Sequence, residues 1–593
     1  MKITKTFLLG ICSCISLSMS AEGYQFPGGT GTSEDPYQIV TAEDLDHVRD
    51  YLGNSEVNFK LMNDIDLTEY LDGGSWQPIG GDVNNAFVGV FDGNNCTISN
   101  LLILGGSNGL GFFGRVQTPG EVRNLIIENA EVSGGDWCGI LCSTNGNWER
   151  AGGTLKNCRV INSYLEGNSC LGAIAGVNEG TVDGCAGINN TIEGAAGTIG
   201  GLLGECSANS SNSRVIDCFS SATVMGGGDN VSGLIGLFRI EQNPNYEAAL
   251  QNCASYGDVS GNGAVAGIVA YQQGVTSTII DNCYSACNVT GYQAGGIGGS
   301  PIDGKVTNCY ASGAITANDG AEPWSGGIAG TAYQLLQDCY YSGVISGAGK
   351  IGGVCGRNWP SLVVSKCYYN SEGASMNMGE GHDEATFDAI GLLPEEMKSF
   401  DYIKFSNPDK WQIKQGVSFP YFKNQTDPIT IEKCNLTGAS GTYSGDVAEM
   451  FFSGSMSGGL YDVEVTFDNG VWTATWPDMS VYENEIVSVF ALEEGKMPSQ
   501  VATLKVDGSS SVEELEITQL ANVFSGKGFV MLKNMSGTEN LCYEMVNMSG
   551  LVVMSGIAEQ DMTNISTERF PNGVYLLNVK SSERVECHKV IIK

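Results

Sequence analysis

Histidine is scarce in this chain, with three among 593 residues: His47, His382 and His588. None of them lies in an HExxH sequence, which supplies two ligands and the general base of many zinc peptidases. The acidic loops contain no DxDxDG sequence of the kind that binds Ca²⁺. We therefore expect no catalytic residue, no metal site and no bound cofactor.

Positive charge is also scarce. The chain has 30 Lys and Arg residues against 66 Asp and Glu residues, for a net charge of −36. A surface this acidic repels phosphate backbones and anionic lipid headgroups. Nucleic acid is therefore excluded as an expected partner.

Long apolar runs are missing after the N-terminus. The apolar stretch Phe7–Leu17 follows Lys2 and Lys5 and precedes small residues, which is the pattern of a secretory signal. It is too short for the roughly 20-residue helix that spans a bilayer. We predict a signal peptide over residues 1–21 and no transmembrane segment; a lipoprotein with Cys14 as the lipidated end is the alternative.

Helical periodicity is missing from the middle of the chain, whereas glycine is abundant, at 82 residues. Apolar residues do not recur there at i, i+3 and i+4 over ten or more positions. The chain has short runs that alternate apolar and polar residues, such as Ala314–Thr316 and Val344–Ser346, broken by Gly, Asn and Asp. This pattern predicts short strands.

Cysteine pairs with metal-ligand spacing are missing too, although 18 of the 20 cysteines follow the predicted signal peptide. Eight of the cysteines instead recur at intervals of 26 to 35 residues. They are Cys158, Cys185, Cys218, Cys253, Cys283, Cys309, Cys339 and Cys367. A period of roughly 20–50 residues indicates stacked supersecondary units.

A second element, Gly-apolar-apolar-Gly or a close variant, occurs in nine copies, two before Cys158 and seven between these eight cysteines. The copies are Gly111–Gly114, Gly139–Cys142, Gly172–Gly176, Gly201–Gly204, Gly233–Gly236, Gly267–Ala270, Gly296–Gly299, Gly327–Gly330 and Gly353–Gly356. A phosphate-binding turn is the alternative explanation, but no GK[ST] follows any copy. We expect glycine here because it permits positive φ or close approach between neighbouring coils.

Together these patterns predict an all-β fold, a right-handed parallel β-helix with three short strands per repeat and coils about 4.8 Å apart. Equivalent residues then stack, so the cysteines form an internal column of free, buried thiols; disulfides within the column are the alternative. Asn or Asp precedes six of the cysteines and tolerates a left-handed bend, which predicts a corner of each coil. These corner residues are Asn157, Asp217, Asn252, Asn282, Asn308 and Asp338.

The glycine element, inside a repeat with a Cys-Tyr strand, resembles the GLUG motif of bacterial surface proteins, which include adhesins and the non-catalytic part of some immunoglobulin A peptidases. The segments Gly29–Leu45 and Trp76–Ile103 are similar to the opening of such proteins. Leu392–Phe400 and Phe419–Phe422 are similar to their closing segment. The resemblance covers residues 29–423 and implies an architecture rather than an activity.

The domain boundaries follow from these patterns. Thr41 is a good N-cap for a short helix over Ala42–Leu52, which would cover the open strand edge of the first coil. Alternating residues after 427 predict an immunoglobulin-sized antiparallel β-sandwich. The predicted parts are an N-terminal cap and first coil over 22–85, the repeats over 86–375, a C-terminal cap over 376–426, a β-sandwich over 427–520, and a last β-sandwich over 521–593.

The last part resembles the type IX secretion sorting domain. The matching residues are Gly550, Gly573, Val574, Tyr575, Lys589 and Lys593. The resemblance implies type IX secretion machinery as a partner, a location on the outer-membrane surface or outside the cell, and removal of the tail at the surface. An ordinary terminal β-sandwich is the alternative.

For a ligand site, the sequence offers four tryptophans in or near insertions between coils. Trp137, Trp148, Trp324 and Trp359 are candidate contacts for sugars or proteins; the alternative is that they cover coil corners. No basic group recurs at one repeat position, and no glycosidase carboxylate pair can be picked out. We expect an adhesin or ligand-binding stalk with an unknown protein or glycan ligand; a β-helical polysaccharide lyase or glycosidase and a purely structural surface protein are the alternatives.

Overall fold

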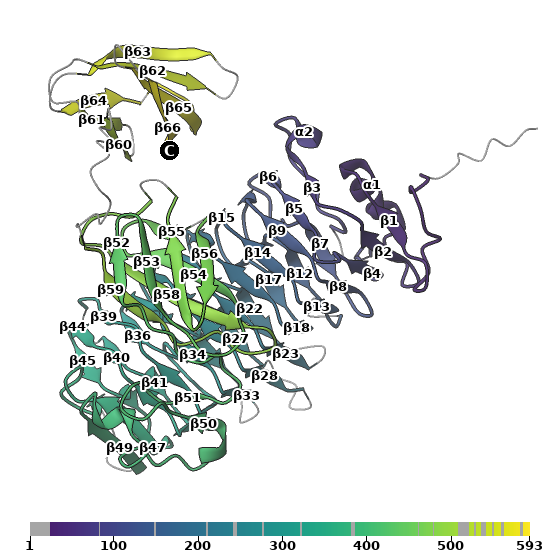
Figure 1. The fold of residues 1–593 in the computed structure, drawn as a ribbon. Helices are drawn as coiled ribbons and strands as arrows, with labels where there is room; N and C mark the ends of the chain where they lie inside the picture. Colours follow the sequence, from purple (N-terminus) through teal and green to yellow (C-terminus); the bar gives the residue numbers. More distant parts are fainter. Residues whose placement is uncertain are drawn as a thin grey trace, which may run out of the picture. The chain divides into compact units, whose positions relative to one another are not determined.

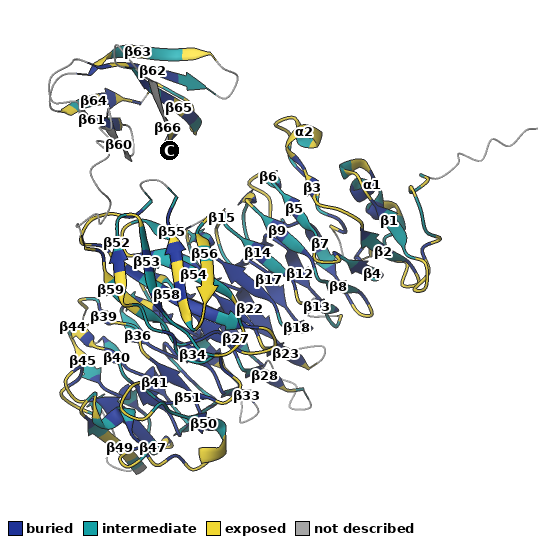
Figure 2. Ribbon diagram, viewed as in Figure 1, coloured by how far each residue is buried: buried dark blue, intermediate teal, exposed yellow. Residues whose placement is uncertain are grey.

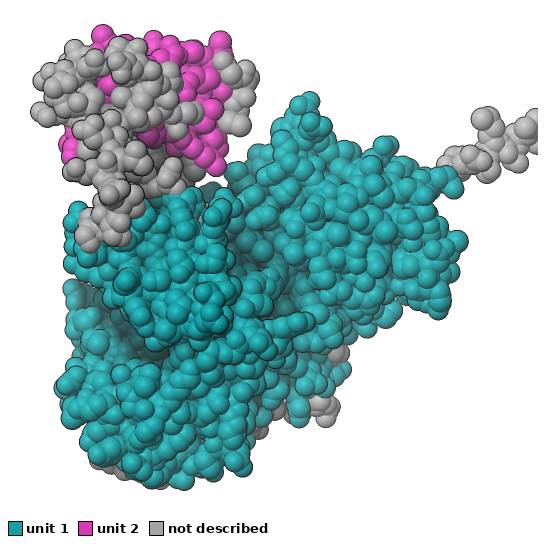
Figure 3. All heavy atoms as spheres, in the orientation of Figure 1, with its two compact units in different colours: residues 1–509 teal, residues 510–593 magenta. Residues whose placement is uncertain are grey.

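The computed structural model describes residues in two compact units, 1–509 and 510–593 (Figure 3). Residues 1–23, which contain the predicted signal peptide, lie outside the described residues. The described ranges are 24–81, 84–146, 150–208, 212–240, 246–274, 278–320, 323–380, 386–460, 462–477, 480–507, 521–526, 529–534, 541–547, 551–558, 562–567, 569–580 and 585–592.

A β-solenoid of about ten turns makes up most of the first unit (Figure 1). Its strands pair in parallel and stack into sheets that we call A (23 strands), B (six strands, continued by three), C (nine strands) and D (eight strands). One coil contains β18 (Thr181–Asp183), β19 (Ala186–Ile188), β20 (Thr191–Gly194), β21 (Thr198–Gly200) and β22 (Leu203–Ser207). The sequence predicts three strands per repeat; this coil has five, because left-handed bends at Gly184 and Asn189 divide the extended runs.

The coils stack in register, so each side chain lies above its equivalent. Val182 pairs with Leu155 in the coil before and with Val215 in the coil after, and all three are fully buried. Residues of this kind fill the interior of the solenoid (Figure 2). Register is the condition for this core, because a shift of one residue would turn the apolar side chains outward.

The predicted corners are confirmed. All six Asn or Asp residues that precede a column cysteine have positive φ, between 50° and 56°. Neighbouring corner side chains also bond to one another: the Asn282 amide donates to Asn252 and the Asn252 amide donates to Asp217, each over 2.8 Å. The bend therefore supplies a second, polar ladder beside the cysteine column.

The column of free thiols is confirmed as well. All eight column cysteines are buried and free. Cys158 Sγ donates to the Lys156 carbonyl at 3.4 Å, and Cys185 Sγ accepts from the backbone N–H of Cys158 at 3.4 Å. Burial raises the pKa of the Cys185 thiol well above its ordinary value, which keeps it protonated.

The glycine elements mark close approach between backbones. A Cβ at Gly326 would lie 2.2 Å from the Ala329 carbonyl oxygen, and one at Gly327 would lie 2.2 Å from that of Gly353. Neither glycine is among the residues with positive φ. Of the two expected reasons for glycine, close approach applies here, so no phosphate-binding turn is needed to explain the motif.

The first coil begins with the expected capped helix. Thr41 Oγ1 accepts from the Asp44 backbone N–H, and the Asp44 carboxylate accepts from the Thr41 N–H, which is a capping box. The helix α1 (Ala42–Asp46) continues as the 3-10 helix η1 (His47–Tyr51), and a second short helix, α2, covers Thr68–Leu71. Leu45 and Val48 are fully buried against the first strands, β1 (Tyr37–Ile39) and β2 (Asn58–Leu61).

The segment predicted to cap the far end does two things. Its first part adds two parallel strands to the last coil: β48 (Met378–Glu380) pairs with β46 (Cys355–Asn358), and β49 (Thr386–Leu392) pairs with β47 (Val363–Asn370). The rest, residues 393–426, which we call the return segment, lies against the outer face of sheet A.

That outer face carries a column of tyrosines, each directly after a column cysteine. Tyr284, Tyr310, Tyr340 and Tyr368 begin or lie in β34 (Tyr284–Ser285), β38 (Tyr310–Ala311), β43 (Tyr340–Tyr341) and β47. The rings of Tyr310 and Tyr340 are stacked, with centroids 4.8 Å apart and planes 2° apart. All four tyrosines are buried, although they point away from the solenoid interior.

The return segment covers this tyrosine column and bonds to the hydroxyl groups of Tyr310, Tyr340 and Tyr368, whereas the Tyr284 hydroxyl donates to the Pro498 carbonyl. Tyr310 Oη donates to Gln425 Oε1 at 3.0 Å, and Tyr368 Oη accepts from the Lys404 backbone N–H at 2.8 Å. Trp411 packs over Tyr310 with ring centroids 6.1 Å apart. Because a buried hydroxyl without a partner costs free energy, these bonds fix where the segment lies.

Residues 433–505 form two antiparallel four-stranded sheets, the two-sheet domain, around a shared apolar cluster that includes Trp472 and Val487. One sheet contains β52 (Lys433–Asn435), β53 (Gly438–Thr442), β57 (Val471–Thr475) and β56 (Glu464–Asp468); the other contains β55 (Gly458–Leu460), β54 (Val447–Gly454), β58 (Ile486–Glu493) and β59 (Ala502–Lys505). The domain packs on the solenoid: Phe490 stacks on Tyr256 at 3.8 Å, and Arg159 forms a two-bond ion pair with Glu449.

The second unit has a three-stranded and a four-stranded antiparallel sheet around its own apolar cluster. Its strands are β60 (Ala521–Gly526), β61 (Phe529–Asn534) and β64 (Met562–Ser566), and β63 (Val552–Ala558), β62 (Leu541–Asn547), β65 (Gly573–Lys580) and β66 (Val585–Ile592).

Within the described ranges, no helix is long and apolar enough to cross a membrane.

A thiol titration tests the cysteine column. Without the predicted signal peptide, which contains Cys12 and Cys14, and with the C-terminal domain still attached, the denatured and unreduced chain should show close to 18 thiols. In the native protein the exposed Cys542 should react quickly and the half-buried Cys96 more slowly, whereas burial protects the column. A reduced sample is the control, and a count far below 18 in the unreduced sample would mean that disulfides form.

A buried carboxylate shapes the two-sheet domain. Glu485 is 1% exposed and accepts from the backbone N–H groups of Met456 and Ser457 at 2.6 Å and of Tyr482 at 2.9 Å. Burial raises the pKa of this carboxyl, but the hydrogen bonds from Tyr482, Ser457 and Met456 together lower it by more. The pKa therefore lies below its ordinary value. The ionised form is therefore the one that stabilises the turn between β54 and β55.

Replacing Glu485 by Gln should lower the free energy of unfolding by about 2 kcal/mol at neutral pH, because several bonds to a charged acceptor are lost. Because the pKa of Glu485 is lower in the folded chain than the value of 4.5 in the unfolded chain, the ionised carboxylate stabilises the fold at any pH above 4.5. This stabilisation is lost as the pH falls through the pKa of the folded state. The two proteins should thus converge in acid when urea unfolding is followed by tryptophan fluorescence. Glu464→Gln, at an exposed position of β56, is the matched control. Two results would contradict the assignment: an equal loss of unfolding free energy in Glu464→Gln, or a difference between Glu485→Gln and the wild type that stays the same in acid.

Candidate functional site

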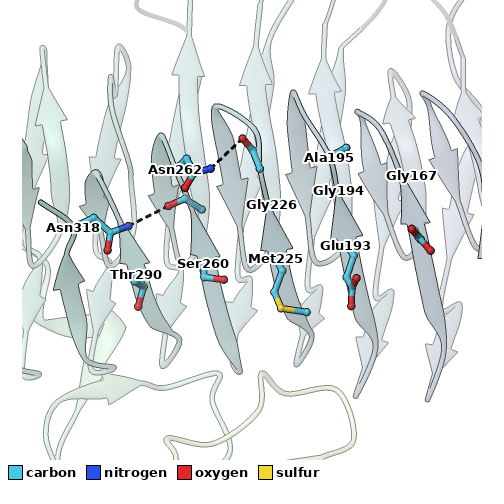
Figure 4. Close-up of a pocket in the computed structure, with 13 residues that line it drawn as sticks. Gly167, Glu193, Gly194, Ala195, Met225, Gly226, Ser260, Asn262, Thr290 and Asn318 are labelled. Carbon is cyan, nitrogen blue, oxygen red and sulfur yellow. Dashed lines mark hydrogen bonds between the residues drawn. The ribbon is translucent and has the colours of Figure 1, made fainter. Parts of the chain in front are cut away.

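The outer face of sheet C carries a shallow groove of about 480 Å³ (Figure 4). Each strand of this sheet buries an apolar residue inside the solenoid, such as Leu165, Ile192 or Val224, and the residue that follows it faces outward. The strands of sheet C are β6 (Leu102–Leu104), β10 (Glu131–Ser133), β15 (Tyr164–Gly167), β20, β25 (Thr223–Gly226), β30 (Asp258–Gly261), β35 (Asn288–Gly291), β39 (Ile315–Ala317) and β44 (Ile345–Gly347).

Glycines form one edge of the groove. Gly167, Gly194, Gly226 and Gly261 end four successive strands and all line it. A Cβ at Gly194 would lie 2.2 Å from Ile199 Cδ1, so the apolar core of the solenoid excludes a side chain at this position. The requirement for glycine therefore leaves a furrow along the ends of the strands.

Two carboxylates occupy the N-terminal end of the groove. Glu166 and Glu193 are paired in register on the neighbouring strands β15 and β20. Tyr164 Oη donates to Glu166 Oε2 at 3.4 Å. Burial, and then the charges of Glu193 and Glu166, raise the pKa of Tyr164 above its ordinary value, so the phenol stays a donor.

The other end is uncharged. Met225, which is 39% exposed, is followed by the hydroxyl groups of Ser260 and Thr290. The amides of Asn262 and Asn318 are oriented by the backbone: Asn262 Nδ2 donates to the Gly227 carbonyl at 3.4 Å and Asn318 Nδ2 to that of Gly261 at 3.5 Å (Figure 4). The groove can therefore hold an extended polar ligand through hydrogen bonds.

No metal site adds to this groove in the described part of the chain, where no group of three or more His, Cys, Asp or Glu side chains could hold an ion.

The predicted tryptophans do not line the groove. Trp324 and Trp359 come together on either side of Arg357, whose Cζ lies 4.4 Å and 4.9 Å from their ring centroids. Both are half-buried, and the cation–π contacts hold them against the solenoid. Trp137 is 47% exposed at a left-handed bend, and Trp148 lies outside the described residues.

The residues of the predicted sorting motif lie in the second unit. Gly573, Val574 and Tyr575 begin β65, where Tyr575 Oη donates to the Pro571 carbonyl at 3.0 Å. Lys589 is exposed in β66. Gly550 and Lys593 lie outside the described residues.

Sequence reasoning missed the groove, although the sequence carries a signal for it. A polar-apolar-x-Gly tetrapeptide recurs at 164–167, 191–194, 223–226, 258–261 and 288–291. Its third residue faces the groove at every copy, and its fourth is the glycine of sheet C.

Residues 526–593 match a family model described as a secretion system C-terminal sorting domain. This domain marks proteins that type IX secretion exports to the cell surface or the extracellular space. The chain is therefore an exported protein, and its tail interacts with the type IX secretion machinery.

Two known proteins are similar to parts of the chain. A "Putative Gly-rich membrane protein" of Evansella cellulosilytica is 46% identical over 110 residues, which are 18% of this chain and 12% of that protein. Halomucin of Haloquadratum walsbyi is 35% identical over 123 residues, which are 20% of this chain and 1% of that protein. The chain thus spans a small part of the length of these relatives.

Solved structures give only remote matches. The BSP domain of a biofilm associated protein is 9% identical and covers 28% of this chain and 29% of that chain, with a TM-score of 0.12. The titin domains Z1Z2 in complex with telethonin are 16% identical and cover 28% of this chain and 93% of that chain, with a TM-score of 0.11.

Proposed function

We propose that this protein is an adhesin or ligand-binding stalk of the cell surface, built as a right-handed β-helix of GLUG repeats with β-sandwiches after it. The sorting domain supports the surface location. The parallel solenoid and the nine glycine elements support the repeat family, and the paired antiparallel sheets support the sandwiches.

The observation that carries the proposal is the groove over sheet C. It extends across five neighbouring strands, β15 to β35, and presents carboxylates, hydroxyls and amides at the repeat spacing of about 4.8 Å. A regular, open and polar face suits recognition of an extended glycan or protein segment. Its shallowness suits binding better than catalysis, which needs a site that excludes water.

A carbohydrate-active enzyme is the second candidate, favoured by the register of Glu166 and Glu193. Neighbouring strands lie about 4.8 Å apart, near the separation of about 5–5.5 Å between the two carboxyl groups of retaining glycosidases. Both side chains, however, extend from adjacent rungs of one flat face rather than from opposite sides of a cleft. A purely structural surface role is the third candidate and requires neither binding nor turnover.

The test is a glycan and host-protein array run beside polysaccharide degradation assays, with the exported chain and Met225→Arg. We expect a ligand whose affinity falls at least tenfold in Met225→Arg, because the new side chain fills the centre of the groove. Met376→Arg, at a position that is 50% exposed outside the groove, should bind like the wild type.

Other outcomes separate the candidates. Release of sugar products without stable binding, lost in Glu193→Gln, would favour the enzyme. Neither binding nor turnover would leave the structural role.

A further inference from the structure

A second, deeper cleft of about 600 Å³ lies between the solenoid and the two-sheet domain. One wall is the row of turns that lead from sheet A into sheet C, and the other is formed by β54, β55, β58 and β59. Its volume is within the range of about 300–1,000 Å³ for small-molecule sites, which are common where domains meet. No predicted site residue belongs to it.

The lining of the cleft is polar but almost uncharged. Hydroxyl and amide side chains predominate, and Asp258 is the one carboxylate among the lining residues, which include no Lys, Arg or His. Asp258 Oδ1 accepts from Asn288 Nδ2 at 2.9 Å, so part of its capacity is already used. A chain with a net charge of −36 and no cation in the cleft repels anionic polymers there.

The cleft is long and narrow. Its solenoid wall takes residues from six successive coils, at Asn190, Ser221, Gly257, Asn288, Ser312 and Ser342. Six coils spaced by about 4.8 Å give a length of about 24 Å, so a volume of about 600 Å³ leaves a mean cross-section of about 25 Å². That space fits a single extended chain.

Both walls are held in place without a ligand. Phe490 stacks on Tyr256 at 3.8 Å with planes 6° apart, at the base where the domain meets the solenoid. The Glu485 carboxylate fixes Met456 and Ser457 at the rim. Such preorganisation lowers the entropy cost of binding.

Aromatic surface adds to the polar groups. Phe419 of the return segment is half-buried and lines the cleft, whereas Phe452 and Phe490, which also line it, are only 2% and 6% exposed. Uncharged hydroxyl and amide partners beside an accessible ring are what the hydroxyl groups and C–H faces of a sugar require.

We infer that this cleft binds a linear, uncharged oligosaccharide. The site is separate from the groove of the proposed function: Thr191, at the start of β20, lines the cleft, whereas Glu193 and Gly194, at its end, line the groove. The inference therefore holds or fails without regard to the ligand of the groove.

Calorimetric titration of the exported chain tests it, with cellohexaose, maltohexaose, xylohexaose and mannohexaose as probes and a hexagalacturonate and a Ser/Asn-rich peptide as comparisons. Ser312→Trp fills the cleft from the solenoid wall and Thr503→Trp from the other, at two exposed positions. Ser107→Trp and Thr473→Trp are matched controls at exposed positions outside the cleft.

We expect at least one neutral hexasaccharide to bind, with an affinity that falls at least tenfold in both cleft variants and is unchanged in both controls and in Met225→Arg. Circular dichroism of each variant checks that the fold is kept. The inference is overturned if no neutral probe binds, if hexagalacturonate or the peptide binds as well, or if binding survives in both folded cleft variants. Loss of binding in Met225→Arg alone would place the neutral sugar in the groove instead.

Discussion

Register between successive coils is the constraint on which this structure depends. The parallel pairing places each residue directly over its equivalent one coil away, so a residue type that recurs with the period becomes a continuous column. Inside the solenoid the columns are apolar or thiol, and at the bends they are Asn and Asp in the left-handed region. Corner amides also bond along the stack, as Asn282 does to Asn252 and Asn252 to Asp217.

The same constraint builds the outer surfaces. The residue after each column cysteine must face outward, and where it is tyrosine the rings stack into a large apolar face with a line of hydroxyl groups. Such a face needs a cover, and the return segment and two-sheet domain supply it through Gln425, Lys404 and Phe490. The cleft lies where that cover meets the turns into sheet C, so the tyrosine column also positions the second candidate site.

Much of the solenoid follows from the sequence because its determinants are local and repeated. The cysteine period, the Asn and Asp bends and the N-cap at Thr41 each need only a few adjacent residues, and all are present as expected. The number of strands per coil is harder to predict, because bends such as Gly184 and Asn189 are decided by single residues.

Contacts between distant segments could not be predicted in the same way. Tyr310 and Gln425 are 115 residues apart, and nothing near either residue indicates that they meet. The groove does not follow from conspicuous residues, because its shape comes from positions that lack a side chain. Trp324 and Trp359 are conspicuous, yet they enclose Arg357 and lie outside the groove.

Hydrogen–deuterium exchange of Tyr310→Ala compared with Tyr402→Ala is the most direct measurement of whether the tyrosine column holds the cover in place. Tyr402 is 51% exposed in the return segment, so its loss should change little. In Tyr310→Ala we expect faster exchange throughout residues 393–426 and in β58. Strands of sheet D, such as β21, should keep their protection. Faster exchange confined to β38 and its two neighbouring strands, with the return segment still protected, would show that the cover is held by other contacts.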